Sequence, residues 1–195
     1  MTTVTRKGSQ LLTVVLGGVL MAGCVHIERY PQSWEPVHAG AAAGCIAVAA
    51  TYVNEGENSS GSRVLLATWI APHQYKTAAD QAAFETDLIK ARTVQLQLTS
   101  SVLTIVANGE NIHREWSLDA SRHEFECKRG AIRIRGFDVA NDIVFGVSEG
   151  SDDLYRVGDH LVVKSHGGGV GFAFIFPVVG YGTSWGRFAV IPSPR

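Results

Sequence analysis

The sequence predicts a mainly β protein, an antiparallel meander forming a barrel or a sandwich, with one short helix at residues 77–91. Two observations support this fold class. Short segments in which apolar and polar residues alternate recur between turn residues, which is typical of strands with one buried face. Only one stretch has its apolar residues at helical spacing. Roughly ten to twelve strands make a sheet that tends to curl into a barrel or split into a sandwich.

The first 24 residues have the layout of a secretory signal. Arg6 and Lys7 give a positive start, the apolar run 11–20 follows, and Met21-Ala22-Gly23-Cys24 closes the segment. A retained membrane anchor is the less favoured interpretation, because the apolar run falls short of the ~20 residues that span a bilayer.

The small residues before Cys24 resemble the lipobox of bacterial lipoproteins, although Met21 stands where that family usually has Leu. The resemblance implies that Cys24 carries fatty acids such as palmitate and becomes the new N-terminus. Three acyl chains would anchor the protein stably in a membrane. Because Val25 rather than Asp follows the cysteine, the resemblance implies the outer membrane, facing the periplasm. The alternative is an ordinary secretory signal in which Cys24 is incidental.

This interpretation divides the chain into a signal peptide (1–23), a lipidated N-terminus with a tether (24–43) and a single β-rich domain (44–195). Within the tether, Tyr30 and Trp34 are expected to dock on the domain in preference to lying at lipid headgroups. The mature chain has 172 residues, which suits one domain, with 15 basic and 18 acidic side chains. This charge balance gives no case for a nucleic-acid partner.

Two cysteines remain if Cys24 is lipidated. Cys45 and Cys127 are an even pair in an oxidising compartment, and we predict that they form a disulfide. The alternative is two buried free thiols that pack as small apolar side chains.

The first half of the domain offers two strand candidates and the helix. Residues 45–53 can be a buried strand or a short helix, and the Thr, Tyr and Val at the end of this segment favour the strand. A polar loop covers 54–62, and a second strand is expected over 63–70. Thr77 could cap the helix that runs to Ala91.

Strands dominate the rest of the chain. They are expected at 94–98, 102–106, around Trp116 after an Asn108-Gly109 hairpin turn, at 132–135, 142–147, 154–157, 161–164, around Phe172–Phe176 and at 185–191. In 132–135, Ile132 and Ile134 alternate with two arginines, so one face should be core and the other wet. Gly158-Asp159 predicts a tight turn.

Several motifs resemble catalytic or metal-binding sites but are better explained as turns, loops or strand residues. Gly182-Thr183-Ser184-Trp185-Gly186 matches G-x-S-x-G, but no acid or histidine follows it, so a glycine-rich turn is expected. Residues 165–171 predict a mobile glycine-rich loop, and Asp152-Asp153 predicts solvated turn residues. His123 and Cys127 have metal-ligand spacing for a helix, but a strand would hold them ~13 Å apart.

We therefore expect no metal, no cofactor and no catalytic constellation; a convergent Asp, His and Ser in one pocket would argue for an enzyme instead. The functional prediction is a lipid-anchored envelope protein resembling Gram-negative lipoproteins with a compact β domain. It would be non-enzymatic, with a binding or structural role and a partner in the envelope. The alternative is a lipocalin-like carrier whose small apolar ligand contacts Phe172, Phe174 and Phe176, although these phenylalanines are better explained as core.

Overall fold

The computed structural model describes residues 24–37, 44–71, 78–141, 144–173 and 176–192. For Cys24, 78–79, 137–141, 144–147, 171–173 and 176–178 it describes the backbone.

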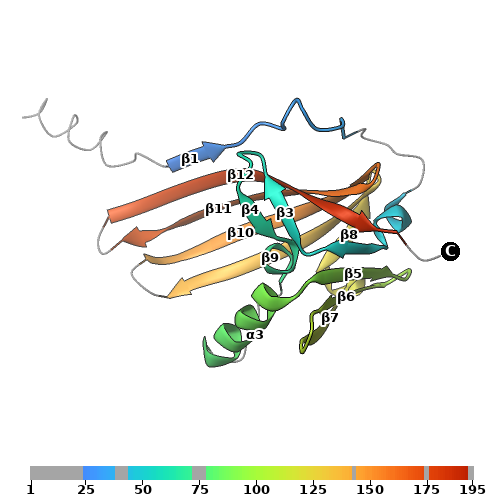
Figure 1. Ribbon diagram of the computed structural model, residues 1–195. Helices are drawn as coiled ribbons and strands as arrows, with labels where there is room; N and C mark the ends of the chain where they lie inside the picture. Colours follow the sequence, from blue (N-terminus) through green and yellow to red (C-terminus); the bar gives the residue numbers. More distant parts are fainter. Residues whose placement is uncertain (1–23, 38–43, 72–77, 142–143, 174–175, 193–195) are drawn as a thin grey trace, which may run out of the picture.

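Strands dominate the described chain, and Figure 1 shows their arrangement. The strands are β1 (Cys24–Ile27), β2 (Thr51–Val53), β3 (Glu55–Asn58), β4 (Arg63–Leu65), β5 (Thr93–Leu98), β6 (Val102–Asn108), β7 (His113–Asp119), β8 (Phe125–Lys128), β9 (Ala131–Asn141), β10 (Val144–Val157), β11 (His160–Ala173) and β12 (Phe176–Ile191). The helices are α2 (Leu66–Trp69) and α3 (Ala78–Lys90), and the 3₁₀ turns are η1 (Cys45–Val48) and η2 (Ala120–Arg122).

The strands form one mainly antiparallel sheet in the order β7-β6-β5-β2-β12-β11-β10-β9-β8. The sheet does not close, and its two halves enclose one core in the manner of a sandwich. Leu96 and Ile105 from β5 and β6 share this core with Ile132, Leu154 and Leu161 from β9, β10 and β11. The predicted fold class is therefore confirmed, with α3 as the one helix of more than a single turn in the described chain.

Four long strands, β9 to β12, project beyond the rest of the domain, as the left side of Figure 1 shows. Residues paired across these strands share a face, and residues two apart along a strand also share a face. Ile132 and Ile134 are buried on the core face, while Arg133 and Arg135 lie on the opposite face, as their alternation predicts. We call this opposite side the outer face.

The N-terminal segment adds a strand beside β12 and then lies against the outer face. β1 pairs in parallel with β12, and the Glu28 backbone N–H extends the ladder to Thr183 O at 3.0 Å. Trp34 is buried in a second cluster with Val157 and Val162. The rings of Tyr30 and Trp185 pack edge-on with centroids 4.9 Å apart. Docking of Tyr30 and Trp34 is confirmed, and residues 24–37 are packed on the domain where a tether was expected.

Three predicted turns or loops are strands instead. Residues 165–171 belong to β11, 182–186 belong to β12, and Asp152-Asp153 lie buried within β10. The glycines in these segments predict turns and loops, but in this sheet they permit close packing between strands. A Cβ on Gly168 would lie 3.1 Å from both Gly180 O and the Tyr181 ring.

Predictions from short local signals agree better with the structure. Residues 45–53 contain both candidates, η1 followed by β2, while the strand expected at 63–70 ends at Leu65 and becomes α2. The Asn108-Gly109 hairpin joins β6 to β7, and Gly158-Asp159 makes the turn between β10 and β11. The disulfide between Cys45 and Cys127 is present, with Cα atoms 5.9 Å apart.

Candidate functional site

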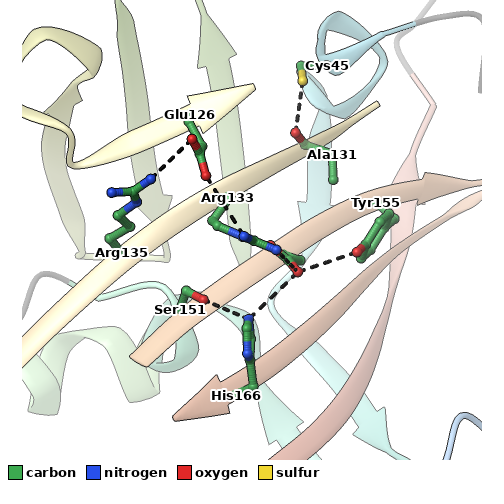
Figure 2. Close-up of polar contacts among 9 residues, drawn as sticks. Cys45, Glu126, Ala131, Arg133, Arg135, Ser151, Tyr155 and His166 are labelled. Carbon is green, nitrogen blue, oxygen red and sulfur yellow. Dashed lines mark hydrogen bonds and ion pairs between the residues drawn. The ribbon is translucent and has the colours of Figure 1, made fainter. Parts of the chain in front are cut away.

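A polar cluster occupies the middle of the outer face, where β9, β10 and β11 lie side by side. Antiparallel register places Asp153 opposite Arg133 and Lys164, and Ser151 opposite His166. Figure 2 shows the side chains of Arg133, Ser151, Tyr155 and His166 converging from these strands. Strand alternation alone thus collects six polar groups on one surface.

An ion pair between Arg133 and Asp153 forms the centre of this cluster. Arg133 donates from Nε to Asp153 Oδ1 at 2.6 Å and from Nη2 to Oδ2 at 2.9 Å. The Asp153 carboxylate is buried, and its hydrogen bonds raise the pKa of the Arg133 guanidinium. Tyr155 also donates to Asp153 Oδ2 at 3.4 Å, and burial raises the pKa of this phenol. A two-pronged pair of this kind fixes both side chains firmly.

His166 joins the cluster through one ring nitrogen. Its Nε2 lies 2.7 Å from Ser151 Oγ and 3.8 Å from Asp153 Oδ2. Burial lowers the pKa of the imidazole, against the opposing effect of the Asp153 charge. His166 is therefore held neutral to a lower pH than a free histidine.

Serine, histidine and aspartate do converge, which is the arrangement that would argue for an enzyme, but their geometry differs from that of a catalytic triad. In a triad the acid holds one ring nitrogen of the histidine while the other nitrogen takes the proton of the nucleophile. Here Ser151 and Asp153 both face Nε2. Asp153 also gives both carboxylate oxygens to Arg133. The arrangement can bind polar groups, and it differs from a triad in that the serine and the acid share one ring nitrogen.

An open depression of about 580 Å³ lies over this cluster. Its lining consists of charged and polar side chains with glycine backbone and one aromatic ring: Arg133, Arg135, Glu149, Gly150, Ser151, His166, Gly167, Gly168 and Tyr181. Arg135 donates from Nη2 to Glu126 Oε2 at 3.1 Å, and this bond lowers the pKa of Glu126. With both arginines paired to carboxylates, the depression is not strongly cationic and suits neutral or mixed polar groups.

The residue beside Asp153 belongs to the opposite face. Asp152 is buried and lies opposite Ile134 in β9 and Ser165 in β11. Burial raises the pKa of Asp152 to about 7, and a hydrogen bond from Ser165 only partly offsets this effect. Asp152 is thus a carboxyl group that sits in the core rather than a member of the outer cluster.

The residues singled out from the sequence lie apart from one another. Cys24 is the first residue of β1, at the projecting end of the sheet, while the Cys45–Cys127 disulfide joins η1 to β8. Phe172 and Phe176 lie in the β11–β12 ladder, but their side chains and all of Phe174 lie outside the described residues. His123 ends η2, and no group of three metal-binding side chains occurs among the described residues.

Sequence reasoning missed the outer cluster, although one signal pointed to it. The Gly158-Asp159 turn was predicted, and counting outward from it pairs Ser151 with His166. The expected strands reach only from Leu154 to the turn and from the turn to Lys164, because the residues beyond them are rich in glycine and serine.

Within the described chain, no helix is both long and apolar enough to cross a membrane. No protein-family model matches this chain, and comparisons with curated proteins and with solved structures give no significant match.

Proposed function

We propose that this chain is a lipoprotein of the Gram-negative cell envelope, anchored through Cys24 in the outer membrane with its domain in the periplasm. One structural observation supports the proposal best. The chain has three cysteines, and the disulfide joins Cys45 to Cys127. Cys24 is therefore the one cysteine left for a lipid, as expected for a lipoprotein whose other cysteines are oxidised.

We further propose that the domain acts by binding a partner rather than by catalysis. The main support is the shared contact of Ser151 and Asp153 with one nitrogen of His166, because this geometry provides no relay for activating a serine. The polar depression on the outer face offers hydrogen-bonding groups to a periplasmic partner. Both of its arginines are already paired with carboxylates, so recognition would rest mainly on shape and hydrogen bonds.

The carrier alternative has weaker support. Carriers of small apolar ligands bury most of the ligand in a largely apolar pocket. Three depressions lined by described residues have charged side chains in their linings, and the two beside His166 and His160 are open to solvent. This favours binding at a surface over carriage in a cavity.

Fatty-acid labelling in a bacterial host tests the anchor. The native chain should incorporate a clickable palmitate analogue and fractionate with the outer membrane. Cys24→Ser should lose the label and become soluble in the periplasm. A Cys127→Ala variant serves as the matched control, because it also lacks one cysteine but should keep the label. Continued labelling of Cys24→Ser would contradict the proposal.

Native mass spectrometry of the lipidated protein, extracted gently from its own membrane, tests the binding role. A co-purifying protein would support a partner in the envelope and identify it. A bound mass of a small molecule would instead favour the carrier. Recovery of the bare lipoprotein alone would count against stable binding of either kind.

A further inference from the structure

Most of the large apolar side chains that the described chain exposes gather at one place. They are Val25 (67% exposed), Ile27 (62%), Val170 (62%), Val179 (49%) and Tyr181 (45%). Two others, Ile46 and Ile89, lie in η1 and α3. Exposed apolar side chains that gather in one place mark a candidate interaction surface, whereas singly scattered ones do not.

Strand register puts the five side chains on a single face. Val25 of β1 lies opposite Tyr181 of β12, and Ile27 is two residues further along β1. Val179 is two residues before Tyr181 and lies opposite Val170 of β11. Because paired residues and residues two apart share a face, all five belong to the outer face of the sheet. We call them the apolar end.

The apolar end adjoins the residue that would carry the lipid. Cys24 directly precedes Val25, and its backbone pairs with Gly180, which lies between Val179 and Tyr181. β1 is held to the sheet at its other end by Glu28, whose backbone N–H donates to Thr183 O at 3.0 Å and whose carboxylate accepts from Ser59. Acyl chains attached at Cys24 would therefore leave from a fixed point beside the apolar end, not from a loose tether.

Along β11 and β12, the residues on the two sides of the apolar end differ in charge. Toward the hairpin tip, residues 170–179 contain no charged side chain. Toward the core, the polar depression begins within one or two residue positions, with Arg135, Glu149 and His166. Val25, Val170, Val179 and Tyr181 span about 7 Å along the strands, which matches the shallow depth at which amphipathic surfaces enter a bilayer interface. Ile27, opposite Thr183, lies about 7 Å further along, level with His166. Tyr181 lies at the boundary, where tyrosine is favoured at membranes.

We propose that the apolar end of the sheet lies in the surface of the phospholipid bilayer that holds the Cys24 anchor. The projecting ends of β11 and β12 would then point into the headgroup region, and the depression over His166 would sit at the water boundary. The inference rests on the lipidation proposed above. It goes further by fixing which part of the domain touches the membrane and how the domain is oriented.

Site-specific fluorescence on the intact lipidated protein tests this orientation. Val179→Cys and Val170→Cys would be labelled with the environment-sensitive dye NBD, and Asp159→Cys, in the exposed turn at the other end of β10 and β11, is the matched control. The introduced thiol reacts alone, because Cys45 and Cys127 are joined and Cys24 is acylated. The labelled proteins would be placed in vesicles of phosphatidylethanolamine and phosphatidylglycerol with and without doxyl-labelled lipid.

The expected result is a blue-shifted NBD signal at positions 179 and 170, quenched by doxyl lipid, with no quenching at position 159. Equal access of aqueous dithionite to all three labels, on protein that carries the fatty acid and floats with the vesicles, would overturn the orientation and leave the anchor intact. Protection from dithionite without quenching by lipid would overturn it in favour of a protein partner or a second copy. Absence of the fatty acid would remove the proposed function and this inference together.

Discussion

Asp152 and Asp153 are adjacent in β10, yet their carboxyl groups lie on opposite faces of the sheet. Asp153 faces outward and accepts two hydrogen bonds from Arg133. Asp152 faces the core, where burial raises the pKa of its carboxyl group to about 7. Within the described chain no ion pair reaches Asp152, so the two neighbours should affect stability in opposite ways.

Asp152→Asn is expected to stabilise the domain at pH 8. The folded chain keeps a proton on Asp152 up to about pH 7, whereas the unfolded chain releases it near the ordinary value of 3.8. The contribution of this group to stability is therefore greatest below pH 3.8 and falls as the pH rises toward 7. The loss can reach roughly 4 kcal/mol, since each unit of pKa shift is worth about 1.4 kcal/mol. Asparagine keeps the shape and removes the titration.

Urea unfolding at pH 5 and at pH 8 measures this effect. The native protein should lose stability between the two values and Asp152→Asn should lose less. Asp159→Asn, in the exposed turn that follows β10, is the control and should behave like the native chain. An unchanged difference between pH 5 and pH 8 in Asp152→Asn would show that Asp152 does not titrate in this range.

Asp153→Asn is expected to destabilise the domain by roughly 2–3 kcal/mol. Removing one partner of a largely buried pair leaves the other charge without compensation, here the guanidinium of Arg133. Arg135→Gln is the comparison, because the pair between Arg135 and Glu126 is more exposed and should cost less than about 1 kcal/mol. Denaturant midpoints measure the loss of stability in both variants. Equal losses would show that the Arg133–Asp153 pair stabilises the domain no more than the exposed Arg135–Glu126 pair does.

Loss of the disulfide is expected to lower stability substantially. Cys45 and Cys127 are 82 residues apart, and closing a loop of this length is worth at most about 4.5 kcal/mol in the chain-entropy model. The double variant Cys45→Ala, Cys127→Ala should therefore melt at a lower temperature, and dithiothreitol should lower the melting temperature of the native protein but not of the variant. If unfolded Cys24→Ser protein reacts with maleimide at two thiols before reduction, the disulfide does not form.

The two glycines of the G-x-S-x-G motif should respond differently to alanine. A Cβ at Gly186 would lie 2.8 Å from the Trp69 ring and 3.1 Å from the Phe188 ring, so Gly186→Ala should cost about 1–3 kcal/mol through overpacking. A Cβ at Gly182 would meet only His26 O at 3.6 Å. Gly182→Ala should be neutral or slightly stabilising, because alanine restricts the unfolded chain. Similar urea midpoints for both variants would show that the space beside Trp69 and Phe188 does not require glycine at position 186.

The fold class could be predicted because alternation and turn residues are signals that can be seen within a few neighbouring residues. Alternation at Ile132–Arg135 fixed which side of β9 is buried, and Asn108-Gly109 fixed one hairpin. The glycine-rich segments of β11 and β12 carry no such signal, since glycine has no side chain to alternate and is equally common in loops. Their strand character comes from neighbours on both sides, which only the whole sheet supplies.

The outer cluster could not be predicted for the same reason, because it requires knowing how far β10 and β11 extend. Arg133 was correctly expected on the wet face, but Ser151 and His166 meet only because β10 and β11 continue past the residues where their apolar patterns stop. The pairing of β1 with β12 was beyond reach for a different reason. A four-residue strand beside a partner more than 150 residues away leaves no local pattern.

The position of β12 sets an order of events for a newly made chain. Strands β1, β2, β3 and β11 all pair with β12, which follows them in the sequence and so leaves the ribosome after them. Until it arrives, four strand edges are open, and open edges are the templates on which chains aggregate. A product cut short before Phe176 would keep those edges permanently. A chain that has not yet made β12 therefore exposes more unpaired strand edge than the folded domain does.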